Sequence, residues 1–200
     1  EVLACCREHG IAAELTSTEH QSGTDRIVEV MHRQLESGQA ADVYVNIQGD
    51  EPMVTAEHIQ LMLATFAEDP RTQVSTLKVP IAFDRARDPN NVKVVTDALG
   101  RALYFSRAPI PYDRSSPEAS GVQYYKHLGL YAYAAQALET FHKLQPSRLE
   151  LIERLEQLRF LENGVPIAVR ETSQDTIGVD AEEDLRTVEA YFRQMGERPT

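Results

Sequence analysis

The fold of this chain is decided by the stretch Val43-Tyr44-Val45-Asn46-Ile47-Gln48-Gly49-Asp50-Glu51-Pro52. Its first half is an apolar run typical of a buried strand, and its second half is a turn that places carboxylates directly after that strand. Ligands of open α/β sheets bind outside the carboxyl ends of the strands, and Gly49 lets the backbone approach a phosphate or a sugar closely. We therefore expect a ligand site at this strand end.

An acidic turn at a strand end suggests a metal held against phosphate groups. Mg²⁺ in such sites is usually held by one or two carboxylates together with substrate oxygens. The sequence offers one further candidate, Asp180, in Ile177-Gly178-Val179-Asp180. A simpler interpretation exists for each residue, because Asp50 also suits a turn and Asp180 precedes a helix start, where Asp is a common N-cap.

Strands and helices alternate in the first part of the chain. Strands are expected at 11–15, 43–47 and 74–79, and helices with apolar residues at helical spacing at 24–37 and 55–68. Three such alternations predict a parallel sheet covered by helices. The fold class is therefore α/β, with a mostly parallel, Rossmann-like sheet.

The middle of the chain breaks this alternation. Residues 92–96 and 102–106 flank a turn that contains Gly100 and predict an antiparallel hairpin. Residues 108–121 are rich in proline and small polar residues and predict a surface loop. The remaining expected elements are two strands and three helices, at 124–133, 165–169, 136–144, 148–162 and from 181 onward.

Length, charge and cysteine content exclude several classes of partner and of site. Two hundred residues, of which 42% are hydrophobic, suit a single domain over 1–200, with 90–133 as a hairpin, loop and strand sub-region. The net charge of −11 disfavours nucleic acids and anionic membranes as partners, so an anionic substrate would need a metal or local arginines.

There is no apolar run long enough for membrane insertion and no signal region, and we expect a cytoplasmic protein. The adjacent Cys5 and Cys6 argue against a disulfide framework or a zinc site.

The chain begins with Glu1-Val2-Leu3-Ala4, inside a helix that we expect Gly10 to end. A doubly wound nucleotide-binding sheet has a first strand and a turn ahead of such a helix. We therefore expect the sequence to be truncated at its N-terminus.

Strand 124–133 carries the first group of candidate ligand residues. Because residues alternate between the faces of a strand, His127, Gly129, Tyr131 and Tyr133 share one face, which we expect to be polar, while the other face is core. Gly129 would leave a slot between hydrogen-bonding groups that suits a hydroxyl-rich ligand. The alternative is a Tyr/His stripe at the surface or in an interface.

Three further groups each have two interpretations. Ser22-Gly23-Thr24-Asp25 fits a helix cap, and the same helix N-terminus could serve a nucleotide. Glu153, Glu156 and Gln157 would share one helical face, which is either a ligand surface or merely solvated. Arg107 is either a guanidinium for a carboxylate or a surface charge.

Seven ordered segments resemble one family, CMP-KDO synthetase (3-deoxy-manno-octulosonate cytidylyltransferase), nearly end to end. The segments are His20-Gln21-Ser22-Gly23-Thr24-Asp25-Arg26, Val45-Asn46-Ile47-Gln48-Gly49-Asp50-Glu51-Pro52, Pro89-Asn90-Asn91-Val92-Lys93-Val94-Val95, Ala102-Leu103-Tyr104-Phe105-Ser106-Arg107, His127-Leu128-Gly129-Leu130-Tyr131, Leu155-Glu156-Gln157-Leu158-Arg159 and Gly178-Val179-Asp180. The resemblance implies a nucleotide-diphospho-sugar transferase fold and Mg²⁺-dependent transfer of CMP from CTP to the anomeric hydroxyl of KDO, with release of pyrophosphate, for lipopolysaccharide synthesis.

The resemblance also implies residue roles. Asp50 and Asp180 would be the catalytic pair that holds Mg²⁺. The sugar acid would contact Gln48, Arg107, His127, Tyr131, Glu156 and Gln157. The nucleotide would lie near Ser22, Gly23, Thr24 and Arg26.

This chain departs from the family in one important place. The family's glycine-rich basic loop, with an Arg and a Lys for the triphosphate, is absent, so we expect the 200-residue chain alone to be poorly active. The alternatives are a related nucleotidyltransferase for 8-amino-KDO or another acid sugar, and a noncatalytic remnant. We also expect a homodimer through residues 92–112, which carry the hydrophobic side chains of Leu103, Tyr104, Phe105 and Ile110.

Overall fold

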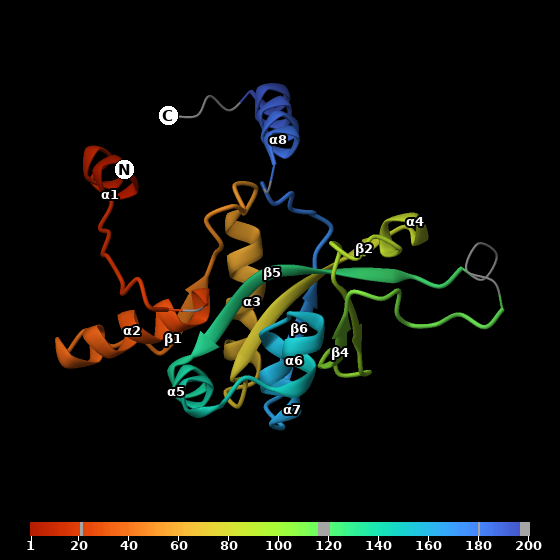
Figure 1. Ribbon diagram of the computed structural model, residues 1–200, viewed down its shortest axis with the longest axis horizontal. Coiled ribbons are helices and arrows are strands. Elements are labelled where there is room, and N and C mark those ends of the chain that lie inside the picture. The colour runs from red at the N-terminus through yellow and green to blue at the C-terminus, as the bar shows by residue number, and fades with distance from the viewer. Residues whose placement is uncertain (21, 116–120, 180, 197–200) are drawn as a thin grey trace.

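The computed structural model describes residues 1–20, 22–115, 121–179 and 181–196. Within these ranges a six-stranded sheet is surrounded by helices (Figure 1). The strands are β1 (Val43–Asn46), β2 (Val74–Ile81), β3 (Lys93–Thr96), β4 (Ala102–Ser106), β5 (Tyr124–Ala134) and β6 (Ile167–Glu171). The helices are α1 (Val2–Glu8), α2 (Gly23–Glu36), α3 (Ala56–Glu68), α4 (Phe83–Ala86), α5 (Ala135–Lys143), α6 (Arg148–Glu153), α7 (Gln157–Glu162) and α8 (Glu182–Met195).

The long strand β5 organises the sheet. Its whole length pairs with β2 in antiparallel register, from Val74 opposite Tyr133 to Ile81 opposite Tyr124. Its other edge pairs with β3 near the start of β5 and with β1 near its end. Because β6 pairs with β2 in parallel, the strands β1, β2, β3 and β6 run in one direction and β4 and β5 in the other. The α/β class is confirmed, and the sheet is mixed because β5 lies between β1 and β2.

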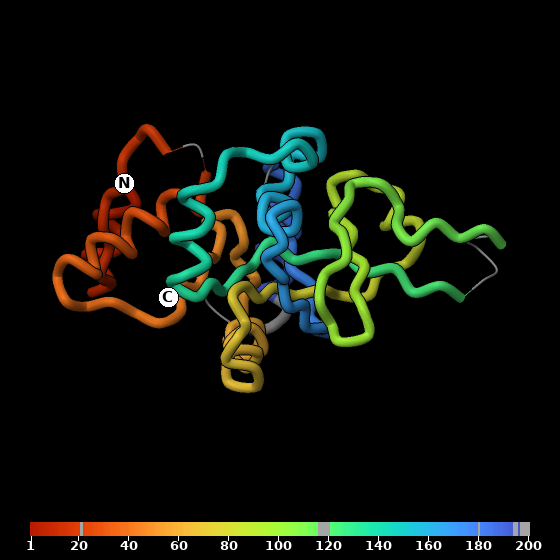
Figure 2. The backbone as a smooth tube through the Cα atoms, turned by 90° about the horizontal axis from the view of Figure 1, so that it is seen from below, coloured from red at the N-terminus to blue at the C-terminus, as the bar shows by residue number. Residues whose placement is uncertain are grey.

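Both faces of the sheet carry a cluster of buried hydrophobic residues, and helices cover each of them. One face packs Tyr131 and Tyr133 of β5 against α2, α5 and α7, and the other packs Leu128 and Leu130 against α3. Figure 2 shows α3 on one side of the sheet and α5 to α7 on the other. The face of β5 that the sequence predicts to be polar is therefore buried as well, since Tyr131 is only 8% exposed.

Two expected elements differ from the structure. Residues 11–15 are not a strand but an arm along α2, where Arg33 donates to the carbonyl of Leu15 at 2.7 Å. The helix expected at 148–162 is broken at Arg154, whose φ of 54° is left-handed and cannot continue a helix. Glu153 therefore does not share a helical face with Glu156.

The β3–β4 hairpin is confirmed, with Lys93 opposite Ser106. The cap of α2 is also confirmed, because the side chain of Ser22 accepts a hydrogen bond from the amide of Asp25 at 3.1 Å. None of the described helices combines the length and the hydrophobicity that crossing a membrane requires.

Candidate functional site

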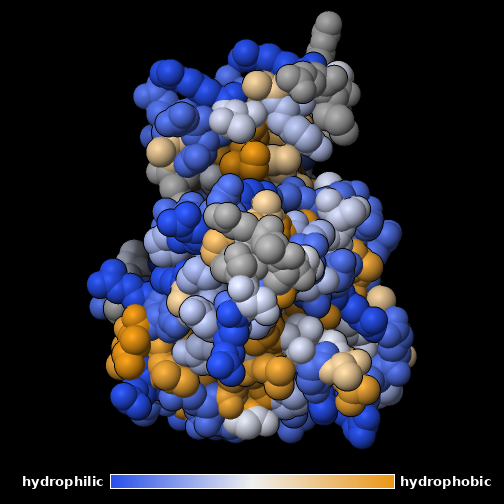
Figure 3. Space-filling model, turned by 90° about the vertical axis from the view of Figure 1, so that its right-hand side faces the viewer, coloured by the Kyte–Doolittle hydropathy of each residue, from blue (hydrophilic) through white to orange (hydrophobic). Residues whose placement is uncertain are grey.

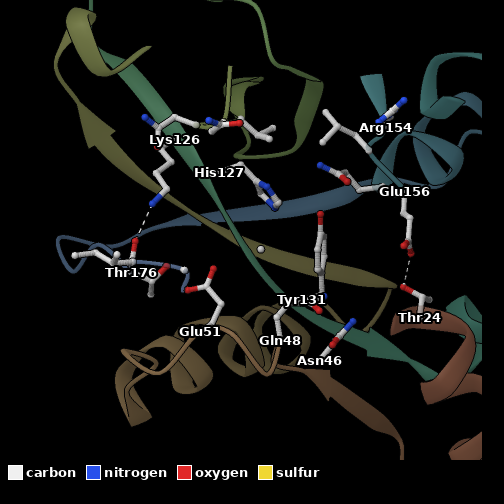
Figure 4. Close-up of a pocket in the computed structure, with 18 of the residues that line it drawn as sticks. Thr24, Asn46, Gln48, Glu51, Lys126, His127, Tyr131, Arg154, Glu156 and Thr176 are labelled. Atoms are coloured by element: carbon white, nitrogen blue, oxygen red, sulfur yellow. Dashed lines mark hydrogen bonds between the residues drawn. The ribbon is translucent and has the colours of Figure 1, made fainter. Parts of the chain in front are cut away.

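A cavity of about 650 Å³ lies beside the end of β1 and the middle of β5. Its walls come from the start of α2, the turn after β1, the middle of β5, the segment between α6 and α7, and the loop that leads to α8 (Figure 4). Of the residues that the sequence and the resemblance predict, it brings together Thr24, Gln48, His127, Tyr131, Glu156 and Gln157.

His127 stands on β5 at one wall of the cavity. Its Nε2 lies 3.0 Å from the hydroxyl oxygen of Thr76, and that hydroxyl donates to the carbonyl of Leu130 at 2.7 Å. Because the one hydroxyl hydrogen is used in this way, Nε2 of the imidazole donates, and Nδ1 is the acceptor. Burial lowers the pKa of His127 to about 3. His127 is therefore neutral at pH 7, with one lone pair for a ligand hydroxyl.

Tyr131 presents a buried polar atom to the same space. Its hydroxyl has no hydrogen-bond partner, and Figure 4 shows it pointing into the cavity. The ring is stacked on Tyr133 with centroids 5.5 Å apart. Burial raises the pKa of Tyr131 well above its ordinary value. An unpaired buried hydroxyl costs free energy, and a bound polar ligand would satisfy it.

Glu156 connects the residues that we expect to bind the nucleotide with those that we expect to bind the sugar. Its carboxylate accepts a hydrogen bond from the hydroxyl of Thr24 at 3.0 Å, which connects the start of α7 to the first turn of α2 (Figure 4). Burial raises the pKa of Glu156, against the lowering effect of that hydrogen bond. Gln157 follows it and is 6% exposed. The Ser22–Thr24 turn and the Glu156-Gln157 pair thus form one continuous wall.

One candidate metal residue, Asp50, lies between the lining residues Gln48 and Glu51 but does not itself line the cavity. Asp50 is exposed in the turn after β1, and its main-chain carbonyl accepts a hydrogen bond from the amide of Val179 at 2.8 Å. Lys126 binds the same loop, donating to the carbonyl of Thr176 at 2.8 Å. Asp180 lies outside the described residues. Val179, the last described residue before it, contacts the turn at Asp50.

The donors in this turn suit a magnesium ion. No group of three His, Cys, Asp or Glu side chains that could hold a metal occurs within the described part of the chain, but Mg²⁺ needs only one or two carboxylates when substrate phosphates supply other oxygens. Asp50 is such a carboxylate, and Glu51 beside it has a buried oxygen, Oε2, without a hydrogen-bond partner. Hard oxygen donors at the edge of an open cavity fit this cation.

Two predicted site arginines lie away from the cavity lining. Arg26 donates to the hydroxyl of Thr16 at 2.7 Å and to the carbonyl of Ser17 at 2.8 Å, so it holds the 11–20 arm. Arg107 donates to the carbonyl of Glu153 at 2.8 Å and to that of Pro89 at 3.0 Å. Direct contact of either guanidinium with a ligand stays a prediction, because these carbonyl bonds would first have to be exchanged.

Several lining residues escaped the prediction from sequence. They are Asn46, Glu51, Asn90, Asn91, Lys126 and Arg154. Asn46 and Glu51 lie within the stretch that decides the fold, and a polar residue at the end of an apolar strand was an available signal for the first. Lys126 precedes His127, and nothing in its local sequence indicates that it reaches the loop at Thr176.

Known proteins resemble this chain over most of its length. A family model described as cytidylyltransferase matches residues 1–172. A 3-deoxy-manno-octulosonate cytidylyltransferase of Acidobacterium capsulatum is 56% identical over 94% of this chain and 74% of that relative. One of Koribacter versatilis is 52% identical over 96% of this chain and 71% of that relative.

A solved structure is similar over nearly the whole chain. It is that of CMP:2-keto-3-deoxy-manno-octonic acid synthetase complexed with CTP, with a TM-score of 0.89 and 40% identity. The match covers 97% of this chain and 77% of the other.

Proposed function

This chain belongs to the 3-deoxy-manno-octulosonate cytidylyltransferase family, and we propose that it transfers CMP from CTP to the anomeric hydroxyl of KDO and releases pyrophosphate. The observation that carries the proposal is the convergence of His127, Tyr131, Glu156 and Gln157 on one cavity beside Asp50. These residues come from a strand and a helix that are distant in the sequence. Their meeting in one cavity is difficult to attribute to solvation.

The chemistry of the lining suits a sugar acid with many hydroxyl groups. His127 offers an acceptor at Nδ1, Tyr131 an unpaired hydroxyl, and Gln157 a buried amide. Glu156 can accept from a sugar hydroxyl while Thr24 holds one of its oxygens. Together these groups would bind the sugar and orient its anomeric hydroxyl, which lowers the entropic part of the barrier.

Asp50 and Asp180 would hold Mg²⁺ at the other end of the cavity. When bound there, Mg²⁺ neutralises phosphate charge and helps to bring the hydroxyl in line with the α-phosphorus. The ammonium group of Lys126 pairs with Asp175 at 2.9 Å and donates to the carbonyl of Thr176 at 2.8 Å. These bonds hold the loop at this end of the cavity. The Ser22–Thr24 turn would lie near the cytidine, as the position of Thr24 in the cavity lining suggests.

We further propose a homodimer in the cytoplasm that supplies CMP-KDO for lipopolysaccharide synthesis. The proposed subunit contact, residues 92–112, keeps Leu103 at 62% exposed. Phe105 cannot contribute, because it is fully buried in the core. Figure 3 shows groups of hydrophobic residues among hydrophilic ones on the side of the molecule where Figure 1 places β4. Sedimentation that finds only monomer at micromolar concentration would contradict the dimer.

Pyrophosphate release tests the proposed reaction. The full-length protein should release pyrophosphate when CTP, KDO and Mg²⁺ are all present, and not when any one of them is omitted. Replacing KDO with 8-amino-KDO and with other acid sugars in the same assay decides between the related activities. No release with any acid sugar would contradict the proposal.

A further inference from the structure

Residues 172–179, which lead from β6 toward α8, have neither helical nor strand structure. They are nevertheless bonded to the rest of the protein at successive positions. The amide of Thr172 donates to the carbonyl of Lys78 at 2.9 Å, and Asp175 pairs with Arg85 at 2.8 Å. The amide of Val179 donates to the carbonyl of Asp50 at 2.8 Å. An irregular segment that is bonded at several points opens less readily than a free loop.

His58 makes the most buried of these attachments. It lies in the first turn of α3 and is 0% exposed. Its Nδ1 accepts a hydrogen bond from the amide of Thr55 at 3.1 Å, and its Nε2 lies 3.0 Å from the carbonyl of Gln174. Since a carbonyl only accepts, Nε2 carries the hydrogen and donates it. One neutral tautomer thus satisfies both contacts.

The side chain of Gln174 strengthens the same attachment. Its amide oxygen accepts from the hydroxyl of Thr55 at 3.0 Å, and its amide nitrogen donates to Glu57 at 2.6 Å. Thr55 and Glu57 both belong to the start of α3, directly after the turn that carries Asp50. The start of α3 is therefore a common anchor for the turn at Asp50 and for residues 172–179.

We propose that His58 is a positioning residue, which holds residues 172–179 against the turn at Asp50 and so supports the position of that turn, whose carboxylate would hold the metal. His58 does not line the cavity. Its effect passes through the bond to Gln174 and along five residues to Val179. The metal part of this inference rests on the proposed function, whereas the attachment itself does not depend on it.

A role limited to capping α3 is the competing explanation, and two substitutions separate the two roles. In His58→Asn the shorter amide can still accept from the amide of Thr55 but does not reach Gln174. In His58→Gln the longer amide can accept from Thr55 and donate to Gln174 at the same time, as the third residue of a capping box does with its own helix. Both replacements are neutral, so no charge is introduced.

Amide hydrogen exchange of Val179 measures the attachment without any metal. In His58→Asn this exchange should accelerate roughly tenfold, the effect of losing about one buried hydrogen bond, while core amides of β5 keep the unmodified rate. His58→Gln should behave as the unmodified protein does. Equal exchange of Val179 in both variants and in the unmodified protein would overturn the proposal.

Two further measurements complete the test. If β5 amides of His58→Asn also exchange faster, the variant is globally destabilised, and the acceleration at Val179 is then compared with the acceleration at β5 in that same variant. A larger acceleration at Val179 than at β5 supports the proposal, and an equal acceleration at both places contradicts it. Titration with Mn²⁺ alone should then show weaker binding to His58→Asn than to His58→Gln. If Mn²⁺ binds none of the proteins, the proposed metal site fails, and the exchange result still decides the role of His58.

Discussion

The amide of Val179 donates a hydrogen bond to the main-chain carbonyl of Asp50 at 2.8 Å. This bond joins the turn after β1 to the loop that leads to α8, although 129 positions separate the two residues in the sequence. The turn that carries Asp50 and the segment that ends at Val179 thus lie side by side, next to the lining residues Glu51 and Gly178. This contact supports the proposal that a metal binds at Asp50.

Asp50→Asn tests the metal role. The substitution should abolish turnover while the free energy of unfolding changes by less than about 1 kcal/mol, because an exposed turn keeps its backbone with an amide in place of the carboxylate. Turnover is measured by pyrophosphate release and stability by urea unfolding. Asp42→Asn, at the exposed opposite end of β1, is the matched control and should keep its activity. An active Asp50→Asn enzyme would rule out the assigned role.

Tyr131→Phe tests whether the unpaired hydroxyl serves a ligand. The buried hydroxyl of Tyr131 has no partner, so its removal should leave the protein as stable as before or stabilise it by up to about 1 kcal/mol. The KM for KDO should rise several-fold, because the sugar loses one hydrogen bond.

Tyr133→Phe provides the contrast for that variant. The side chains of Thr24 and Asn46 lower the pKa of Tyr133 against the raising effect of burial, so polar groups serve its hydroxyl, and its loss should destabilise the protein by about 1 kcal/mol. Urea unfolding compares the two variants. Equal destabilisation by both substitutions would show that Tyr131 is bonded within the protein.

The buried His127 predicts a dependence of stability on pH. Burial lowers its pKa from 6.5 to about 3, so between these values the unfolded chain binds a proton that the folded protein does not. The stability that neutral His127 provides is therefore complete above pH 6.5 and is lost as the pH falls toward 3. The slope from this residue is at most about 1.4 kcal/mol per pH unit.

His127→Gln isolates this contribution from those of the other titrating groups. Urea unfolding of both proteins between pH 4 and 7 should show a smaller loss of stability toward acid in the variant than in the unmodified protein. Parallel curves for the two proteins would mean that His127 already titrates normally in the folded state.

Much of the fold could be predicted from sequence because local patterns determine it. The β3–β4 hairpin has a glycine near its turn, Ser22 caps α2, and the apolar run at β1 ends in a polar turn. The antiparallel position of β5 between β1 and β2 was not predictable in this way, because strand order depends on tertiary packing and leaves no periodic signal. The break at Arg154 also lacks a local signal, since neither glycine nor proline marks it.

The site was predictable where residues lie on one regular element. His127 and Tyr131 share a face of β5, and alternation along a strand is enough to pair them. The contacts of Lys126 with Thr176 and of His58 with Gln174 join elements that are distant in the sequence. Such contacts arise from the path of the irregular segment 172–179, which no pattern of hydrophobic residues describes.

The position of KDO in a crystal of its complex with the full-length protein is the most direct measurement of the central claim. We expect sugar hydroxyls within hydrogen-bonding distance of Nδ1 of His127 and of the hydroxyl of Tyr131, and the anomeric carbon on the side of the cavity nearest Asp50. A sugar bound elsewhere, with the hydroxyl of Tyr131 still unpaired, would contradict it.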